Sequence, residues 1–164
     1  MKHLLLLLAL PLSACGLKPL YAGGGSGAVA NALAGVQVDA IEGRSGWLVA
    51  NALRDRLAAG GSARWRLQVV LDDRIAGLGV RADDSVSRER RTLRARYQLV
   101  EAATGTVVLD ATAGSDAGID VVGSEYATIA AENTALERLA GIVADQIVAR
   151  VALYARRTAA APPS

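Results

Sequence analysis

The sequence of 164 residues contains no phenylalanine, one cysteine and one histidine. A single cysteine excludes a disulfide within the chain. The only histidine, His3, lies in a segment with the composition of a removable leader, so neither a histidine-based catalytic triad nor a His/Cys zinc site is available to the rest of the chain. Adjacent acidic pairs, Asp72-Asp73 and Asp83-Asp84, are typical of solvated turns rather than of calcium sites. We therefore expect no enzymatic activity, no bound metal and no cofactor.

The first fourteen residues have the pattern of a secretory signal peptide. Lys2 and His3 precede an apolar run from Leu4 to Leu12, which is far shorter than the roughly 18 apolar residues of a membrane-spanning helix. Residues 12–15 read Leu-Ser-Ala-Cys, a motif that resembles the bacterial lipobox. The resemblance implies that residues 1–14 are removed and that Cys15 is acylated and anchors the mature chain. An ordinary secreted protein with an unmodified cysteine is the alternative.

Beyond the signal peptide, composition divides the chain into a tether, one domain and a tail. Residues 15–34 include the flexible sequence Gly-Gly-Gly-Ser-Gly at positions 23–27, which predicts a lipidated N-terminus followed by a glycine-rich tether. Residues 35–157 are sufficient for a single domain with a sizeable core. Residues 158–164 are predicted to be a disordered tail.

Hydrophobic periodicity predicts an α+β domain. Apolar and polar residues alternate in four predicted strands, and apolar residues recur at helical spacing in two predicted helices. The predicted strands cover 36–41, 63–72, 86–102 and 106–113, and the predicted helices cover 46–59 and 124–156. Gly105 is expected to supply a positive φ in a hairpin turn, segment 114–123 is predicted to be a loop, and 75–84 a strand end with a loop. This order predicts a four-stranded mixed sheet with two helices packed on one face.

Charge is distributed unevenly between the last two predicted strands. Residues 86–100 contain five arginines and one acidic residue, Glu89. Residues 101–125 contain acidic residues but no lysine or arginine. The five arginines are Arg88, Arg90, Arg91, Arg94 and Arg96. One interpretation is a hairpin with complementary cross-strand pairs, each contributing a few tenths of a kcal/mol. The other is an exposed row of guanidinium groups that binds the phosphates of a polyanion bidentately. For an exported bacterial lipoprotein, we expect this polyanion to be lipopolysaccharide and not nucleic acid.

The segment after the acylation motif resembles the start of alphaproteobacterial LptE proteins. Residues 15–21 read Cys-Gly-Leu-Lys-Pro-Leu-Tyr, which is similar to that family's start, Cys-Gly, an aromatic or apolar residue, any residue, and then Pro-Leu-Tyr. The predicted order of strands and helices is similar to the family's two-helix, four-stranded fold. The arginine-rich strand that begins near Val86 and ends around Tyr97 and Leu99 also resembles the corresponding strand of the family.

This resemblance implies a function that composition alone does not. LptE proteins are non-enzymatic lipoproteins of the outer membrane that plug the barrel protein LptD and assist lipopolysaccharide assembly. Membership implies LptD, lipopolysaccharide and the membrane as partners, and anchoring by lipid on the periplasmic side of the outer membrane, with which Gly16 after Cys15 is consistent. The family's basic residues are credited with lipopolysaccharide binding, which makes the five arginines candidate binding residues. The alternative is a structural envelope lipoprotein that acts as an adaptor or barrel-folding chaperone without binding lipopolysaccharide.

Overall fold

A computed structural model describes residues 28–57, 60, 62–80 and 86–160. The predicted signal peptide, Cys15 and the glycine-rich stretch at 23–27 lie outside the described residues, as do residues 161–164. No helix among the described residues is long and apolar enough to cross a membrane.

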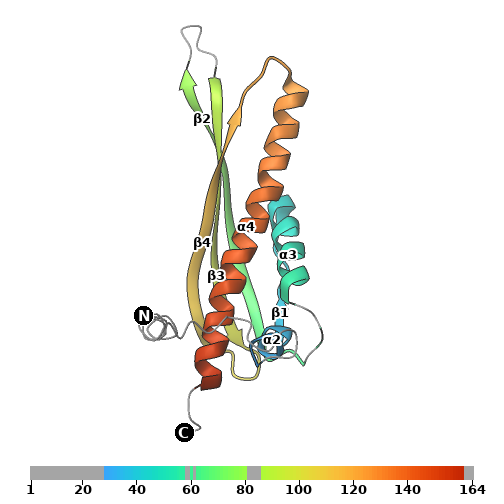
Figure 1. The fold of residues 1–164 in the computed structure, drawn as a ribbon, viewed down its shortest axis with the longest axis vertical. Helices are drawn as coiled ribbons and strands as arrows, with labels where there is room; N and C mark the ends of the chain where they lie inside the picture. The colour runs from blue at the N-terminus through green and yellow to red at the C-terminus, as the bar shows by residue number, and fades with distance from the viewer. Residues whose placement is uncertain (1–27, 58–59, 61, 81–85, 161–164) are drawn as a thin grey trace, which may run out of the picture.

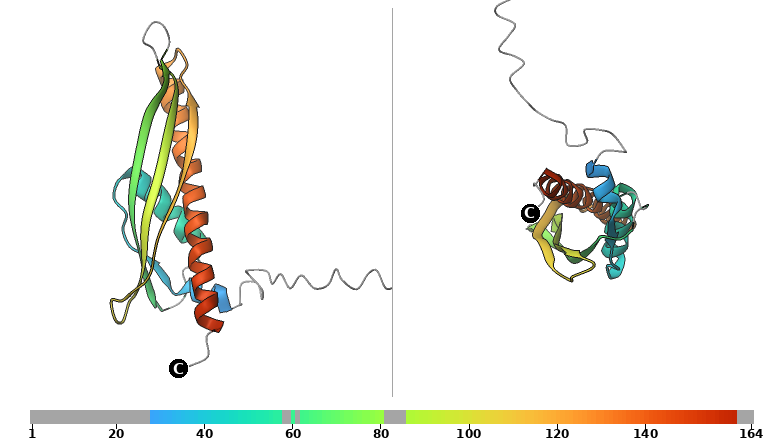
Figure 2. Two further views of the ribbon diagram at one scale, coloured as in Figure 1. Left: turned by 90° about the vertical axis from the view of Figure 1, so that its left-hand side faces the viewer. Right: turned by 90° about the horizontal axis from the view of Figure 1, so that it is seen from below.

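Three long strands and one long helix lie side by side and make the domain elongated (Figure 1). The sheet has the order β1-β2-β3-β4, in which β1 is parallel to β2 and the other neighbours are antiparallel. The strands are β1 (Val36–Val38), β2 (Trp65–Val80), β3 (Val86–Glu101) and β4 (Val107–Asp120), and the helices are α2 (Ala28–Ala34), α3 (Gly43–Leu57) and α4 (Glu125–Ala160). The helices lie behind the sheet in Figure 2, left, which confirms the predicted α+β fold with helices on one face.

Alternation along β2 and β3 builds the core. Every second side chain of these strands points toward the helices, where Leu67, Leu93 and Leu99 are fully buried. α4 contributes a stripe of buried residues at helical spacing, which are Leu136, Leu139, Val143, Ile147 and Val151. Tyr97 also lies in this core with 2% of its surface exposed, and burial raises the pKa of its hydroxyl. The predicted hairpin turn after β3 is confirmed, since Gly105 has a φ of 70°.

Two strands are longer than predicted, whereas β1 ends at Val38 and is shorter than the predicted strand 36–41. β2 continues to Val80, and β4 continues to Asp120, so the predicted loop over 114–123 is wrong for residues 114–120. Glycines weaken the strand pattern in both segments. The ladder with β3 nevertheless continues without interruption from Ala113 to Asp120, and the alternation persists because Ile119 is buried.

Both predicted limits of the domain also need correction. Residues 28–34 form helix α2 rather than part of a tether, because Leu33 is buried in the main core at 4% exposure. α4 continues to Ala160, so the predicted disordered tail is wrong for residues 158–160. The Thr158 hydroxyl donates a hydrogen bond to the Tyr154 carbonyl oxygen over 3.1 Å, as expected within a helix.

Gly46 in α3 allows a close approach between the helix and the segment before it. A Cβ atom at this position would lie 2.5 Å from the carbonyl oxygen of Ile41, a backbone atom that cannot move away cheaply. Gly46→Ala is therefore expected to lower the free energy of unfolding by about 1–3 kcal/mol, measured by urea denaturation.

Gly141 in α4 provides the matched control. A Cβ atom there would meet only the Arg56 Nη2 atom, at 3.8 Å. Because alanine is the better helix former, Gly141→Ala is expected to raise the free energy of unfolding by up to about 1 kcal/mol. Changes of the same sign and size in the two variants would contradict this assignment of Gly46.

Candidate functional site

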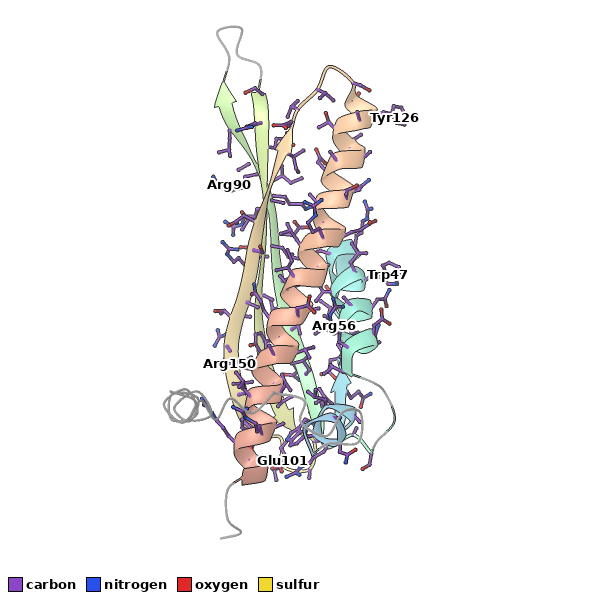
Figure 3. The ribbon with its side chains drawn as sticks, in the orientation of Figure 1. Trp47, Arg56, Arg90, Glu101, Tyr126 and Arg150 are labelled. Atoms are coloured by element: carbon purple, nitrogen blue, oxygen red, sulfur yellow. The ribbon has the colours of Figure 1, made fainter. Side chains whose placement is uncertain are left out.

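The face of the sheet that points away from the helices carries most of the strand charges. We call it the outer face and define it by the residues of the three long strands whose side chains point away from the helices, which are the even-numbered ones. Its charged members are Arg66, Asp72 and Arg74 of β2, Arg88, Arg90, Arg94 and Arg96 of β3, and Asp110, Asp116 and Asp120 of β4. Six arginines therefore stand against four aspartates, a surplus of two positive charges. Arg90 points away from α4 in Figure 3.

Three outer-face arginines form cross-strand pairs with aspartates of β4. The nitrogen–oxygen distances are 3.0 Å for Arg88–Asp120, 3.2 Å for Arg94–Asp116 and 3.0 Å for Arg96–Asp110. These side chains are largely exposed, so each pair contributes little to folding stability. The hairpin with oppositely charged cross-strand pairs, which was the first interpretation of the sequence, is therefore present. These pairs leave the guanidinium groups accessible to solvent.

Hydrogen bonds favour the charged form of two of these aspartates. Arg96 and then Gln98 donate to the Asp110 carboxylate, and these bonds lower its pKa. The pKa of Asp116 is also lowered, chiefly by the hydrogen bond from the Thr92 hydroxyl. Both carboxylates are negatively charged at neutral pH, as exposed aspartates are, and an anion that binds here must displace or bridge them.

Arg90 differs from its neighbours on β3. No described carboxylate forms a salt bridge with it, because the residues opposite are Ala76 in β2 and Gly118 in β4. Together with Arg88, Asp120 and Leu78 it lines a hollow of about 400 Å³ near the end of the strands. Its guanidinium group is thus available to an external anion.

A second hollow, of about 540 Å³, lies at the middle of the outer face. Val70 lines it with 73% of its surface exposed, and Arg94, Arg96 and Thr112 also line it. Gly114 allows Arg94 to lie across β4, since a Cβ atom there would be 2.5 Å from the Arg94 Cδ atom. An apolar side chain bordered by guanidinium groups suits an amphiphile that carries phosphates.

Arg91 lies on the opposite, helix-facing side, and the prediction of one exposed row of five arginines fails for this residue. Its Nε and Nη2 atoms donate to the two carboxylate oxygens of Asp73 at 2.8 and 2.7 Å. Its Nη1 atom donates to the carbonyl oxygen of Glu132 in α4 at 3.1 Å. With only 13% of its side chain exposed, Arg91 fastens α4 to the sheet.

Sequence reasoning also missed Gln146, which connects α4 to the border of the sheet. Its amide oxygen accepts a hydrogen bond from the Gly114 N–H at 2.9 Å, and its amide nitrogen donates to the Gly114 carbonyl oxygen at 3.3 Å. The two residues are 32 positions apart, and no local pattern links them.

The described part of the chain contains no group of three His, Cys, Asp or Glu side chains that could hold a metal ion. Cys15 lies outside the described residues, so its lipidation stays a prediction.

The family model LptE, described as lipopolysaccharide-assembly, matches residues 33–151. A lipoprotein from Caulobacter crescentus of known crystal structure is 26% identical, with a TM-score of 0.69 over 84% of this chain and 100% of that chain. No curated protein matched the chain.

Two more distant solved structures share the fold alone. A minor lipoprotein from Acinetobacter baumannii is 12% identical, with a TM-score of 0.59 over 72% of this chain and 90% of that chain. Rare lipoprotein B from Shewanella oneidensis is 11% identical, with a TM-score of 0.53 over 76% of this chain and 98% of that chain.

Proposed function

The chain belongs to the LptE family of lipopolysaccharide-assembly proteins, and from this premise we propose how it takes part in that assembly. It is the non-enzymatic, lipid-anchored subunit of the outer-membrane lipopolysaccharide translocon. It plugs the LptD barrel and binds lipopolysaccharide with the outer face of its sheet. Anchoring through Cys15 holds it on the periplasmic side of the outer membrane.

The observation that carries the binding proposal is the arrangement of arginines on the outer face. Arg90 forms no salt bridge among the described residues, although its charge acts on Asp116, and Arg94 and Arg96 border the hollow in which Val70 is exposed. Lipopolysaccharide offers the matching chemistry, since it carries phosphates beside acyl chains. Arg91 is not part of this proposal, because Asp73 and Glu132 occupy its donors.

Binding is a non-covalent exchange of partners. Arg94 and Arg96 are exposed by half or more in their ion pairs, so a phosphate can approach without unfolding the sheet. A phosphate group has more acceptor oxygens and more charge than a carboxylate and engages the guanidinium fork bidentately. Arg90 can bind a second phosphate without breaking a salt bridge.

The binding proposal is tested by titrating the protein with lipopolysaccharide at low and at high salt. Interactions between exposed charges are screened as ionic strength rises, so the affinity should fall at high salt. Lipopolysaccharide from which the phosphates have been removed should bind weakly at both salt concentrations. Equal affinity for the two ligands at low salt would contradict a role for the arginines.

The anchoring proposal is tested by Cys15→Ser. The variant should remain an unlipidated precursor, because the thiol is the only one in the chain that can be acylated. Labelling of cells with a radioactive or alkyne-tagged fatty acid measures this directly, with the wild-type chain as control. Normal acylation of the variant would contradict Cys15 as the lipidation site.

A further inference from the structure

Two half-buried polar side chains of β3, Thr92 and Gln98, lie directly opposite the aspartates that pair with Arg94 and Arg96. The Thr92 hydroxyl donates a hydrogen bond to the Oδ1 atom of Asp116 at 2.8 Å. The Nε2 atom of Gln98 donates to an oxygen of the other aspartate, on β4 near the hairpin, also at 2.8 Å. Each of these two carboxylates is therefore bonded to a neutral side chain as well as to an arginine.

Arg94 reaches Asp116 from a more exposed position than Thr92 and over longer distances. It stands opposite Gly114 in the register and extends diagonally to the carboxylate. Its Nη2 atom lies 3.2 and 3.4 Å from the two carboxylate oxygens, whereas the Thr92 hydroxyl lies at 2.8 Å. The hydrogen bond from Thr92 is also the largest single cause of the lowered pKa of Asp116. Asp116 therefore keeps its shortest hydrogen bond when Arg94 moves away.

Arg96 and Gln98 repeat this arrangement at Asp110. Arg96 stands opposite Thr112 and extends diagonally to Asp110, to which its Nη2 and Nε atoms donate at 3.0 and 3.3 Å. The bond from Gln98 is shorter, at 2.8 Å. Here the bond from Arg96 is the largest cause of the lowered pKa of the carboxyl group, and the bond from Gln98 is the second. Asp110 thus also retains a donor when its arginine leaves.

The space for such an exchange lies between the two ion pairs. Thr112 and Gly114 separate the two aspartates on β4, and both line the hollow of about 540 Å³ together with the two arginines. Asp72, which also lines the hollow, is bonded to Arg74 of its own strand at 2.7 Å. A phosphate bound in this hollow therefore has both arginines as neighbours and no carboxylate of β4 between them.

We propose that Thr92 and Gln98 are positioning residues of the phosphate site. Each retains the aspartate opposite it while the neighbouring arginine turns to a phosphate of lipopolysaccharide, so this inference rests on the proposed binding to the outer face. A phosphate that takes a guanidinium group from a carboxylate leaves that carboxylate short of a donor. A neutral donor that is already bonded to it lowers the cost of the exchange. Without this donor the carboxylate depends on the arginine alone and holds it more tightly.

The test compares the affinity of full-length variants for immobilised lipopolysaccharide at low salt by surface plasmon resonance. Thr92→Val with Gln98→Leu removes both donors at nearly unchanged side-chain volume and should weaken binding about fivefold. Gln37→Leu with Thr134→Val removes the same groups from exposed residues of β1 and α4. This matched control should bind within about twofold of the wild type. Thr92→Ser retains the hydroxyl and should bind like the wild type.

Neutral aspartates separate a positioning role from a merely structural one. Asp110→Asn with Asp116→Asn frees both arginines and should raise the affinity about fivefold. Adding Thr92→Val and Gln98→Leu to this variant should then change the affinity by less than about twofold, because no carboxylate competes for the arginines. An equal loss in both backgrounds, or no loss in the wild-type background, would overturn the inference alone. Equal affinity of the wild type for phosphate-free lipopolysaccharide would overturn the proposed function together with it.

Discussion

Replacing Arg91 by methionine is expected to lower the free energy of unfolding by about 3 kcal/mol or more. The substitution leaves Asp73, with 19% of its side chain exposed, without its bidentate partner. It also removes the donor to the Glu132 carbonyl oxygen, which joins α4 to the sheet. Breaking a poorly hydrated ion pair from one side is costly because the remaining charge is not solvated. Urea denaturation followed by circular dichroism measures the change.

Two further variants separate this effect from a general loss of charge. Arg94→Met removes an arginine of the same strand whose side chain is 50% exposed, and it should cost less than about 1 kcal/mol. Arg91→Met combined with Asp73→Leu removes both charges and should recover most of the lost stability. Equal losses in Arg91→Met and Arg94→Met would contradict the structural role of Arg91.

Reversing the charge at both Arg94 and Arg96 is expected to weaken lipopolysaccharide binding at low salt by tenfold or more, which is about 1.4 kcal/mol. Each substitution by glutamate removes a guanidinium group that donates hydrogen bonds to phosphate at the 540 Å³ hollow. It also places a negative charge beside Asp116 or Asp110. Surface plasmon resonance with immobilised lipopolysaccharide is a suitable measurement. Because both side chains are exposed, the double variant should fold normally.

The control for this prediction carries the same change in net charge elsewhere. Arg54 and Arg156 are exposed residues of α3 and α4, and their replacement by glutamate should leave binding within about twofold of the wild type, since screening limits exposed charges to roughly 10 Å. Unchanged binding in the Arg94/Arg96 variant would show that the outer-face arginines are only solvated surface residues and do not bind lipopolysaccharide. Equal losses in both double variants would indicate attraction by net charge alone.

Periodicity predicts the order of the four strands and of α3 and α4, but it does not predict helix α2. The alternation of Leu67, Leu93 and Leu99 with polar neighbours and the helical spacing of Leu139, Val143 and Ile147 are strong local signals, and these residues form the core. The strand ends were missed because glycines interrupt the pattern at 77–79 and 114–118. Those segments are strands because β3 pairs with them. Pairing with a distant strand is not visible in the hydrophobic pattern of a short stretch of sequence.

The candidate site was predictable in part for the same reason. Five arginines in one strand are visible in the sequence, but consecutive residues of a strand point to opposite faces. Arg90 and Arg91 therefore lie on opposite faces of the sheet. Strict use of this alternation excludes Arg91 from the candidate binding residues. The acidic partners on β4 follow from a register that begins at the hairpin, whereas the contact of Gln146 with Gly114 depends on how α4 is placed.

The most direct test of the proposed function is purification of the native lipoprotein from cells in a mild detergent, with its partners identified by mass spectrometry. We expect a large outer-membrane barrel protein, LptD, to be recovered with it in a stable complex of fixed stoichiometry. A wild-type preparation that is correctly lipidated and folded but contains no barrel protein would contradict the proposal that the chain plugs the lipopolysaccharide translocon.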